Sequence, residues 1–206
     1  MGPACAAFGI GRNPQNAAVE KLAQGRVRRQ NGRATHLGHW QRTAGHLSPV
    51  TLVKYLAILE ALYIVFTVRP WHRNIARATL QAPKVYFYDT GLVEGDAGLR
   101  YENLVACALL AHVEHLHDLQ GKETALHYIR TKDGAEVDFA VSEGQELTDL
   151  VECKLTDAKP HHALARFAQE FPTARATQLV RDLRQPREHG NLRVCAAAAW
   201  LAGLAA

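Results

Sequence analysis

Three short segments separated by two tight turns constrain the fold of this chain more than any other feature. They cover residues 125–130, 135–141 and 147–155, and each has the length of a strand. The first turn contains Asp133-Gly134, a pair that favours hairpins, and the second contains Glu143-Gly144. The pattern therefore predicts an antiparallel meander in the second half of the chain.

Helical patterns lie on both sides of this meander. Residues 100–116 carry an apolar stripe at helical spacing, and residues 160–171 predict a second helix. Strands are expected at 176–180 and 192–196, followed by an alanine-rich closing helix at 196–206. Strands that alternate with helices in this way predict an α/β layer arrangement.

The first part of the chain has a different organisation. Residues 1–16 show no periodicity and are expected to form a loose arm, whereas helices are predicted from residue 17, at 35–43 and at 49–61. Ser48 can cap the last of these helices, and Pro49 suits its first turn. Two helices joined by a short turn and followed by a β-rich stretch at 63–68 match a helix-turn-helix with a wing strand, so residues 17–82 are interpreted as a winged-helix-like domain.

Basic residues are concentrated at the N-terminus of a chain whose formal net charge is +4 over 206 residues. Before residue 50 they face a single acidic residue, Glu20. Such a surface can bind phosphates by releasing counterions. The predicted nucleic-acid-binding residues are Arg26, Arg28, Arg29, Arg33, Thr51 and Lys54. A solvated basic surface, or a helical unit that only packs against a neighbouring domain, remains an alternative.

Cysteine spacing and hydropathy exclude several classes of protein. The four cysteines stand apart, without the close pairing of a zinc site or of a small disulfide scaffold, which favours a cytoplasmic protein. Residues 56–68 form the most apolar stretch, but Glu60 interrupts it and Pro70 ends it. It is too short to cross a bilayer, so no membrane partner is expected.

Charged and apolar side chains alternate on the last two strands of the meander. Glu152 and Lys154 are expected to project from one face of their strand, with Cys153 pointing to the core. On the preceding strand, Glu136 and Asp138 are expected to share one face. Val137 and Phe139 would then point to the opposite face. The hairpin can then bring Asp138 beside Glu152. In isolation, a cross-strand pair on a solvated sheet would explain the same pattern.

A longer set of segments resembles one known domain. The resemblance runs from about Leu47 to Leu204 and rests on residues 48–60, 83–92, 101–103, 128–138 and 151–154. The chain is similar to the uncharacterised C-terminal domain of bacterial and archaeal AAA-type ATP-binding proteins. That domain pairs a winged helix with a PD-(D/E)XK nuclease-like core, a mixed sheet flanked by helices, which would here occupy residues 83–206.

The resemblance implies a metal-dependent site. Its catalytic residues would be Asp138, Glu152, Lys154 and Glu102, and its metal ligands Asp138, Glu152 and Cys153. Two carboxylates suit Mg²⁺ or Mn²⁺, and Lys154 would orient the attacking water or neutralise charge on the phosphate. Glu102, at the start of the 100–116 helix, has an alternative role in stabilising the helix N-terminus.

Two functions remain open from the sequence. One is a nucleic-acid-associated protein, with DNA as the expected partner and a Mg²⁺-dependent phosphodiesterase site. The other is a catalytically inactive DNA-binding or regulatory module that partners a separately encoded AAA-type ATPase. No G-x-x-x-x-G-K-[ST] sequence occurs, so no ATP site is expected in this chain. A truncated relic of a longer ATPase is a third possibility.

Overall fold

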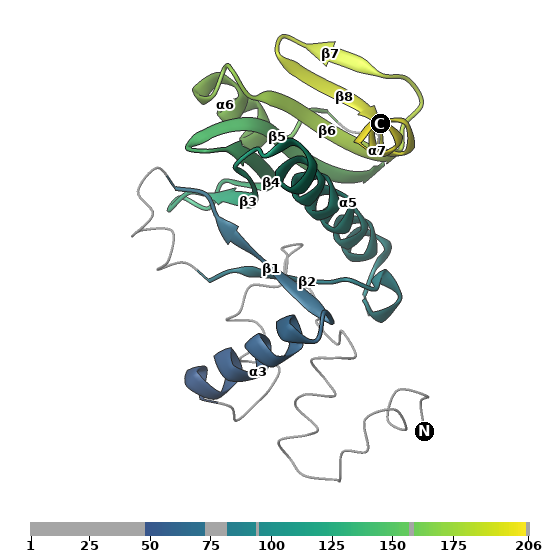
Figure 1. Cartoon of the computed structure of the whole chain (residues 1–206). Coiled ribbons are helices and arrows are strands. Elements are labelled where there is room, and N and C mark those ends of the chain that lie inside the picture. The colour runs from purple at the N-terminus through teal and green to yellow at the C-terminus, as the bar shows by residue number, and fades with distance from the viewer. Residues whose placement is uncertain (1–47, 73–81, 94, 157–158, 205–206) are drawn as a thin grey trace.

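Eight strands form one mixed sheet in the computed structural model, which describes residues 48–72, 82–93, 95–156 and 159–204 (Figure 1). Their order across the sheet is β2-β1-β3-β4-β5-β6-β8-β7. The strands are β1 (Val65–Pro70), β2 (Lys84–Phe87), β3 (Thr124–Arg130), β4 (Glu136–Glu143), β5 (Glu146–Thr156), β6 (Arg175–Asp182), β7 (Arg187–His189) and β8 (Leu192–Ala196). The helical elements are α3 (Pro49–Ala61), the 3-10 turn η1 (Thr90–Leu92), α5 (Ala97–Gln120), α6 (His162–Glu170) and α7 (Ala197–Leu204).

Helices cover both faces of the sheet. The long α5 crosses one face together with α7, and α6 packs on the other (Figure 1). Buried side chains such as Phe139 and Leu179 form the core under α5, whereas Leu150 and Val180 meet Phe167 of α6. The expected mixed α/β architecture, a sheet flanked by helices, is confirmed. The short edge strand β7 was not expected from the sequence.

The antiparallel meander follows the predicted segments closely. Strand β4 pairs antiparallel with β3 and with β5, and β5 then pairs parallel with β6. Gly134 and Gly144 adopt positive φ angles of 86° and 60° in the two connecting turns. Both turns need this left-handed conformation, which glycine adopts without a steric penalty.

Helix α3 begins where the cap predicts. The Ser48 side chain accepts a hydrogen bond from Thr51 N at 3.1 Å, which satisfies one free N–H of the first turn. The buried face of α3 carries Leu52, Leu56 and Leu59, which pack against β1 and β2. The helix is therefore anchored to the same sheet as the meander.

Helix α5 is longer than the predicted helix at 100–116. Asp96 caps it by accepting a hydrogen bond from Leu99 N at 2.9 Å, so the helix begins at Ala97. It ends before Gly121, which has a φ of 65° and donates from its N–H to His117 O. Glu102 consequently lies beyond the first turn, and its alternative role at the helix N-terminus is wrong.

The predicted boundary at residues 82 and 83 lies between two strands that pair with each other. β1 pairs antiparallel with β2 and parallel with β3, so both segments contribute to the sheet. The predicted arm at 1–16 and the predicted helices before residue 48 lie outside the described residues. Among the described helices, none is long and apolar enough to span a membrane.

Candidate functional site

The strands β4 and β5 separate at the point where the predicted site residues lie. Their main-chain pairing ends at Phe139 and Val151. Beyond that pair, side chains replace main-chain partners: Asp138 N donates to Glu152 Oε2 at 3.3 Å, and Cys153 N donates to Asp138 Oδ2 at 2.9 Å. Each carboxylate thus has one oxygen oriented by the opposite strand, and both lie in the opening between the strands.

A β-bulge in β4 interrupts the alternation of its apolar side chains. The register between β3 and β4 shifts between His127 and Ile129, which places one additional residue in β4. Val137 consequently packs under α6, whereas Phe139 packs under α5. The prediction that these two apolar residues share a face is wrong, because strict alternation does not continue through a bulge.

Glu152 and Lys154 lie together at the start of α6. Lys154 Nζ donates to Glu152 Oε1 at 2.6 Å, and His161 Nδ1 lies 3.2 Å from the same oxygen. The fully buried Gln178 holds His161 in place by accepting a hydrogen bond from its main-chain N–H at 2.8 Å. The Glu152 side chain is 4% exposed and that of Lys154 is 33% exposed, so the carboxylate is enclosed while the lysine side chain is partly open to solvent.

Burial dominates the electrostatics of this group. Burial, followed by the charge of Asp138, raises the pKa of Glu152 to about 8, although Lys154 opposes the change. Burial alone would lower the pKa of Lys154, but Glu152 outweighs it and the pKa is raised. Burial, Lys154 and His162 lower the pKa of His161, which favours the neutral imidazole at pH 7.

Sequence reasoning missed Lys84, the first residue of β2. Its side chain is completely buried, and Nζ lies 2.8 Å from Glu136 Oε1, 3.6 Å from Glu102 Oε1 and 3.7 Å from Asp138 Oδ1. Nζ also lies 5.3 Å from the centroid of the Tyr128 ring. A lysine that opens the apolar strand Lys84–Phe87 was the signal available in the sequence.

Glu102 faces this site from α5. Its side chain is 6% exposed, and Oε1 accepts a hydrogen bond from Tyr86 OH at 2.9 Å. Burial, followed by the charge of Glu102, raises the pKa of Tyr86 well above its usual value, so the phenol stays protonated. The Cys153 thiol packs toward the α5 core, and burial also raises its pKa strongly.

The donor set for a metal ion is small. Among the described residues, no group of three or more His, Cys, Asp or Glu side chains is arranged to hold a metal. Asp138 and Glu152 supply two carboxylates, which matches the way proteins bind Mg²⁺ through one or two carboxylates and several waters. These two side chains fit the ion by their chemistry.

The predicted nucleic-acid-binding residues are placed only in part. Lys54 on α3 is exposed, and Thr51 Oγ1 lies 2.9 Å from Ser48 Oγ. Arg26, Arg28, Arg29 and Arg33 lie outside the described residues.

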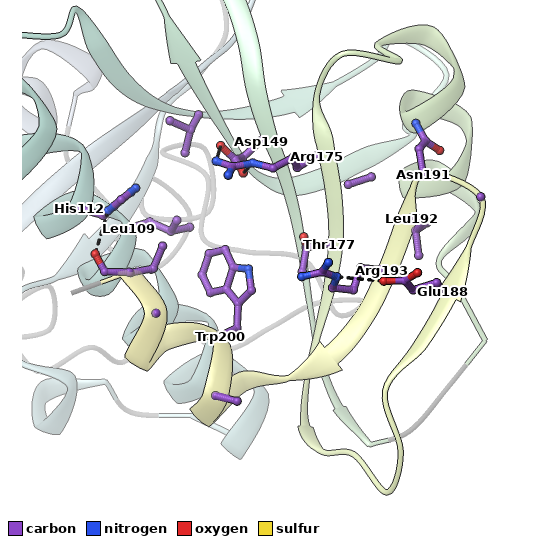
Figure 2. Close-up of a pocket in the computed structure, with 16 residues that line it drawn as sticks. Leu109, His112, Asp149, Arg175, Thr177, Glu188, Asn191, Leu192, Arg193 and Trp200 are labelled. Carbon is purple, nitrogen blue, oxygen red and sulfur yellow. Dashed lines mark hydrogen bonds and ion pairs between the residues drawn. The ribbon is translucent and has the colours of Figure 1, made fainter. Parts of the chain in front are cut away.

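A separate cavity of about 560 Å³ lies between α5, α7 and the strands β5, β6 and β8. Figure 2 shows Trp200 on one side of it and Thr177 with Arg193 on the other. Asp149 binds Arg175 through both oxygens, at 2.8 and 2.9 Å, and Arg193 lies 3.5 Å from Glu188. The cavity contains none of the predicted catalytic residues, and its two arginines are each balanced by a carboxylate.

Two family comparisons cover most of the chain. Residues 19–102 match a family described as Domain of unknown function (DUF8612), and residues 97–199 match one described as Domain of unknown function (DUF4143). The second is a domain found in AAA-ATPase-associated proteins. No curated protein and no solved structure matches the chain significantly. Because the second match spans half of the 206 residues, the chain belongs to the DUF4143 family.

Proposed function

We propose that this chain acts on nucleic acid, with DNA as its substrate, and that Asp138, Glu152 and Lys154 form a divalent-metal-dependent phosphodiesterase site. The observation that supports this most directly is the convergence of two carboxylates and one ammonium in the opening between β4 and β5. The sheet around them would be a PD-(D/E)XK nuclease-like core, and α3 with β1 and β2 part of a winged-helix-like unit.

The two carboxylates are suited to hold Mg²⁺ or Mn²⁺. Main-chain N–H groups orient Asp138 Oδ2 and Glu152 Oε2, while Asp138 Oδ1 lies 3.7 Å from Lys84 Nζ, too far for a hydrogen bond. Glu152 Oε1 faces Lys154, whose partly exposed side chain can move outward when an ion binds. Cys153 was also predicted as a ligand; its N–H orients Asp138, and its protonated thiol is a poor ligand for a hard cation.

The roles of the side chains follow from this arrangement. When bound, a divalent ion polarises a phosphodiester oxygen and lowers the pKa of bound water. Lys154, whose side chain is partly exposed, would then neutralise charge that develops on the phosphate. The Asp138 and Glu152 carboxylates keep their direction because each accepts a main-chain hydrogen bond from the facing strand.

The test is cleavage of supercoiled plasmid DNA with Mg²⁺ or Mn²⁺. Asp138→Asn and Glu152→Gln should abolish cleavage, and Lys154→Met should lower it by roughly 100-fold, the usual loss for one electrostatic contact in the transition state. Glu143→Gln is a matched control, since Glu143 ends β4 and its side chain is 47% exposed beside Lys122. Cleavage that persists in both carboxylate variants at wild-type rate would refute the proposal.

A second candidate is a catalytically inactive regulatory module that partners a separately encoded AAA-type ATPase. The family match supports the association, and the buried Lys84 ammonium favours an inactive site because its positive charge lies 3.7 Å from Asp138, one of the two carboxylates that a metal would need. Calorimetric titration with Mg²⁺ and Mn²⁺ separates the two functions. If the folded protein binds neither ion at millimolar concentration, the module is supported and the phosphodiesterase is not.

A further inference from the structure

Three carboxylates meet on the α5 side of β4 with a single ammonium among them. They belong to Glu102 on α5 and to Glu136 and Asp138 on β4, and their side chains are 6%, 13% and 19% exposed. Ionised carboxylates so poorly hydrated are unfavourable unless a cation accompanies them. Lys84, which all three carboxylates share, supplies a cation from β2, the strand at the opposite edge of the β2-β1-β3-β4 segment of the sheet. The partly exposed Arg130 adds a second positive charge at Glu136 only, with Nε 3.7 Å from Oε2.

The surroundings of Lys84 Nζ are those of a cation held by oxygens. Carboxylate oxygens lie at 2.8, 3.6 and 3.7 Å, and the main-chain oxygen of Asp138 accepts a hydrogen bond at 3.5 Å. The faces of Tyr128 and Phe139 lie 5.3 and 6.0 Å away and add attraction for the positive charge. The whole side chain is inaccessible to solvent, so the ammonium is enclosed by the cluster.

We infer that Lys84 occupies the place of a second cation in the site. The metal count rests on the proposed function: one divalent ion binds to Asp138 and Glu152, and none binds between Asp138 and Glu102. Glu102 is then a positioning residue, which holds the Lys84 ammonium and the Tyr86 hydroxyl, rather than a metal ligand.

Electrostatics explain why one cation excludes the other. A divalent ion between Glu102 and Asp138 would lie within a few ångströms of the ammonium, in a region with little water to screen the repulsion. The same argument predicts what happens without the ammonium. If methionine replaces Lys84, its unbranched stem retains much of the buried packing, while the three carboxylates lose the ammonium that they share. Glu136 keeps the Arg130 guanidinium, and Glu102 keeps the Tyr86 hydroxyl.

The experiment compares Mn²⁺ binding to the wild-type chain and to Lys84→Met. Stoichiometry is measured by calorimetry, and electron paramagnetic resonance detects spin coupling between two close ions. We expect Lys84→Met to bind one more Mn²⁺ per chain than the wild type. Lys122→Met is the matched control, because Lys122 is 41% exposed beside Glu143, and its stoichiometry should not change.

The outcomes separate this inference from the proposed function. A wild-type chain that binds no Mn²⁺ argues against the phosphodiesterase, yet a gained ion in Lys84→Met still supports Lys84 as the resident cation. A wild-type chain that binds two ions, or a folded Lys84→Met chain that gains none, overturns the inference.

A second variant is included in case Lys84→Met does not fold. Lys84→Met combined with Glu136→Gln removes the carboxylate closest to the ammonium and leaves fewer buried charges, and it should also gain one ion. Millimolar Mn²⁺ should raise the melting temperature of either variant more than that of the wild type. If neither variant folds even with Mn²⁺ present, a divalent ion does not replace the ammonium and the inference fails.

Discussion

The carboxyl group of Glu152 should make the stability of this protein fall as the pH rises. Its pKa is raised from 4.5 to about 8 in the folded chain. Below pH 4.5 the carboxyl is protonated in both the folded and unfolded states. Between pH 4.5 and 8 only the folded state retains the proton, so the free energy of unfolding decreases with pH, and above pH 8 the decrease ends.

The size of the effect follows from the two pKa values. Each pKa unit corresponds to about 1.4 kcal/mol, so the carboxyl accounts for at most about 5 kcal/mol between pH 4.5 and 8. Because its titration is coupled to the charges beside it, we expect the free energy of unfolding to decrease by roughly 2–5 kcal/mol over this pH range. For a chain of this length, 1 kcal/mol shifts the melting temperature by about 2–4 °C.

The assay is denaturant unfolding at pH 5 and pH 8.5, followed by circular dichroism, for the wild type and Glu152→Gln. The variant has no carboxyl to ionise and should lose most of the pH-dependent decrease. His161 contributes with the opposite sign, because its lowered pKa makes stability rise with pH, but it is present in both proteins. Parallel pH profiles for the wild type and Glu152→Gln would show that Glu152 does not cause the decrease, and Glu143→Gln should behave as the wild type.

Three further predictions concern the stability of the fold and the metal affinity of the site. Asn103→Ala should destabilise the fold by about 2–4 kcal/mol in denaturant unfolding, because Asn103 makes hydrogen bonds of 2.8 Å to both N and O of Phe87; a loss below 1 kcal/mol would contradict this. Gly121→Ala should cost about 1 kcal/mol in the same assay, since φ is 65°, and an unchanged midpoint would argue against the helix end described. Mn²⁺ affinity measured by calorimetry should fall about tenfold per pH unit below pH 8, because Glu152 must lose its proton first; a flat profile would contradict this.

Local chemistry explains the parts of the fold that the sequence predicted well. Ser48 and Pro49 define the start of α3, and glycines at 134 and 144 define the turns on either side of β4. The spacing of Glu152 and Lys154 places both on one face of β5, and their side chains do meet. These features depend on residues close in sequence, whose preferences act before distant contacts form.

Register and burial could not be predicted in the same way. The bulge that separates Val137 from Phe139 arises where β4 pairs with β3, and alternation along one strand contains no information about it. The predicted helix at 100–116 begins three residues after the observed start of α5 at Ala97. Asp96, a favourable capping residue that accepts from Leu99 N, was a signal in the sequence for the earlier start.

The α/β class, most helix and strand positions, and the candidates Asp138, Glu152 and Lys154 could all be predicted from the amino-acid pattern. Which charges share the site depends on the folded chain, because Lys84, Glu102 and Asp138 come from three different elements, β2, α5 and β4, that meet only when these elements pack together. Burial of a lysine is tolerated only where nearby carboxylates offset the cost of removing its charge from water. That condition depends on how distant elements pack, and it cannot be read from the residues around position 84.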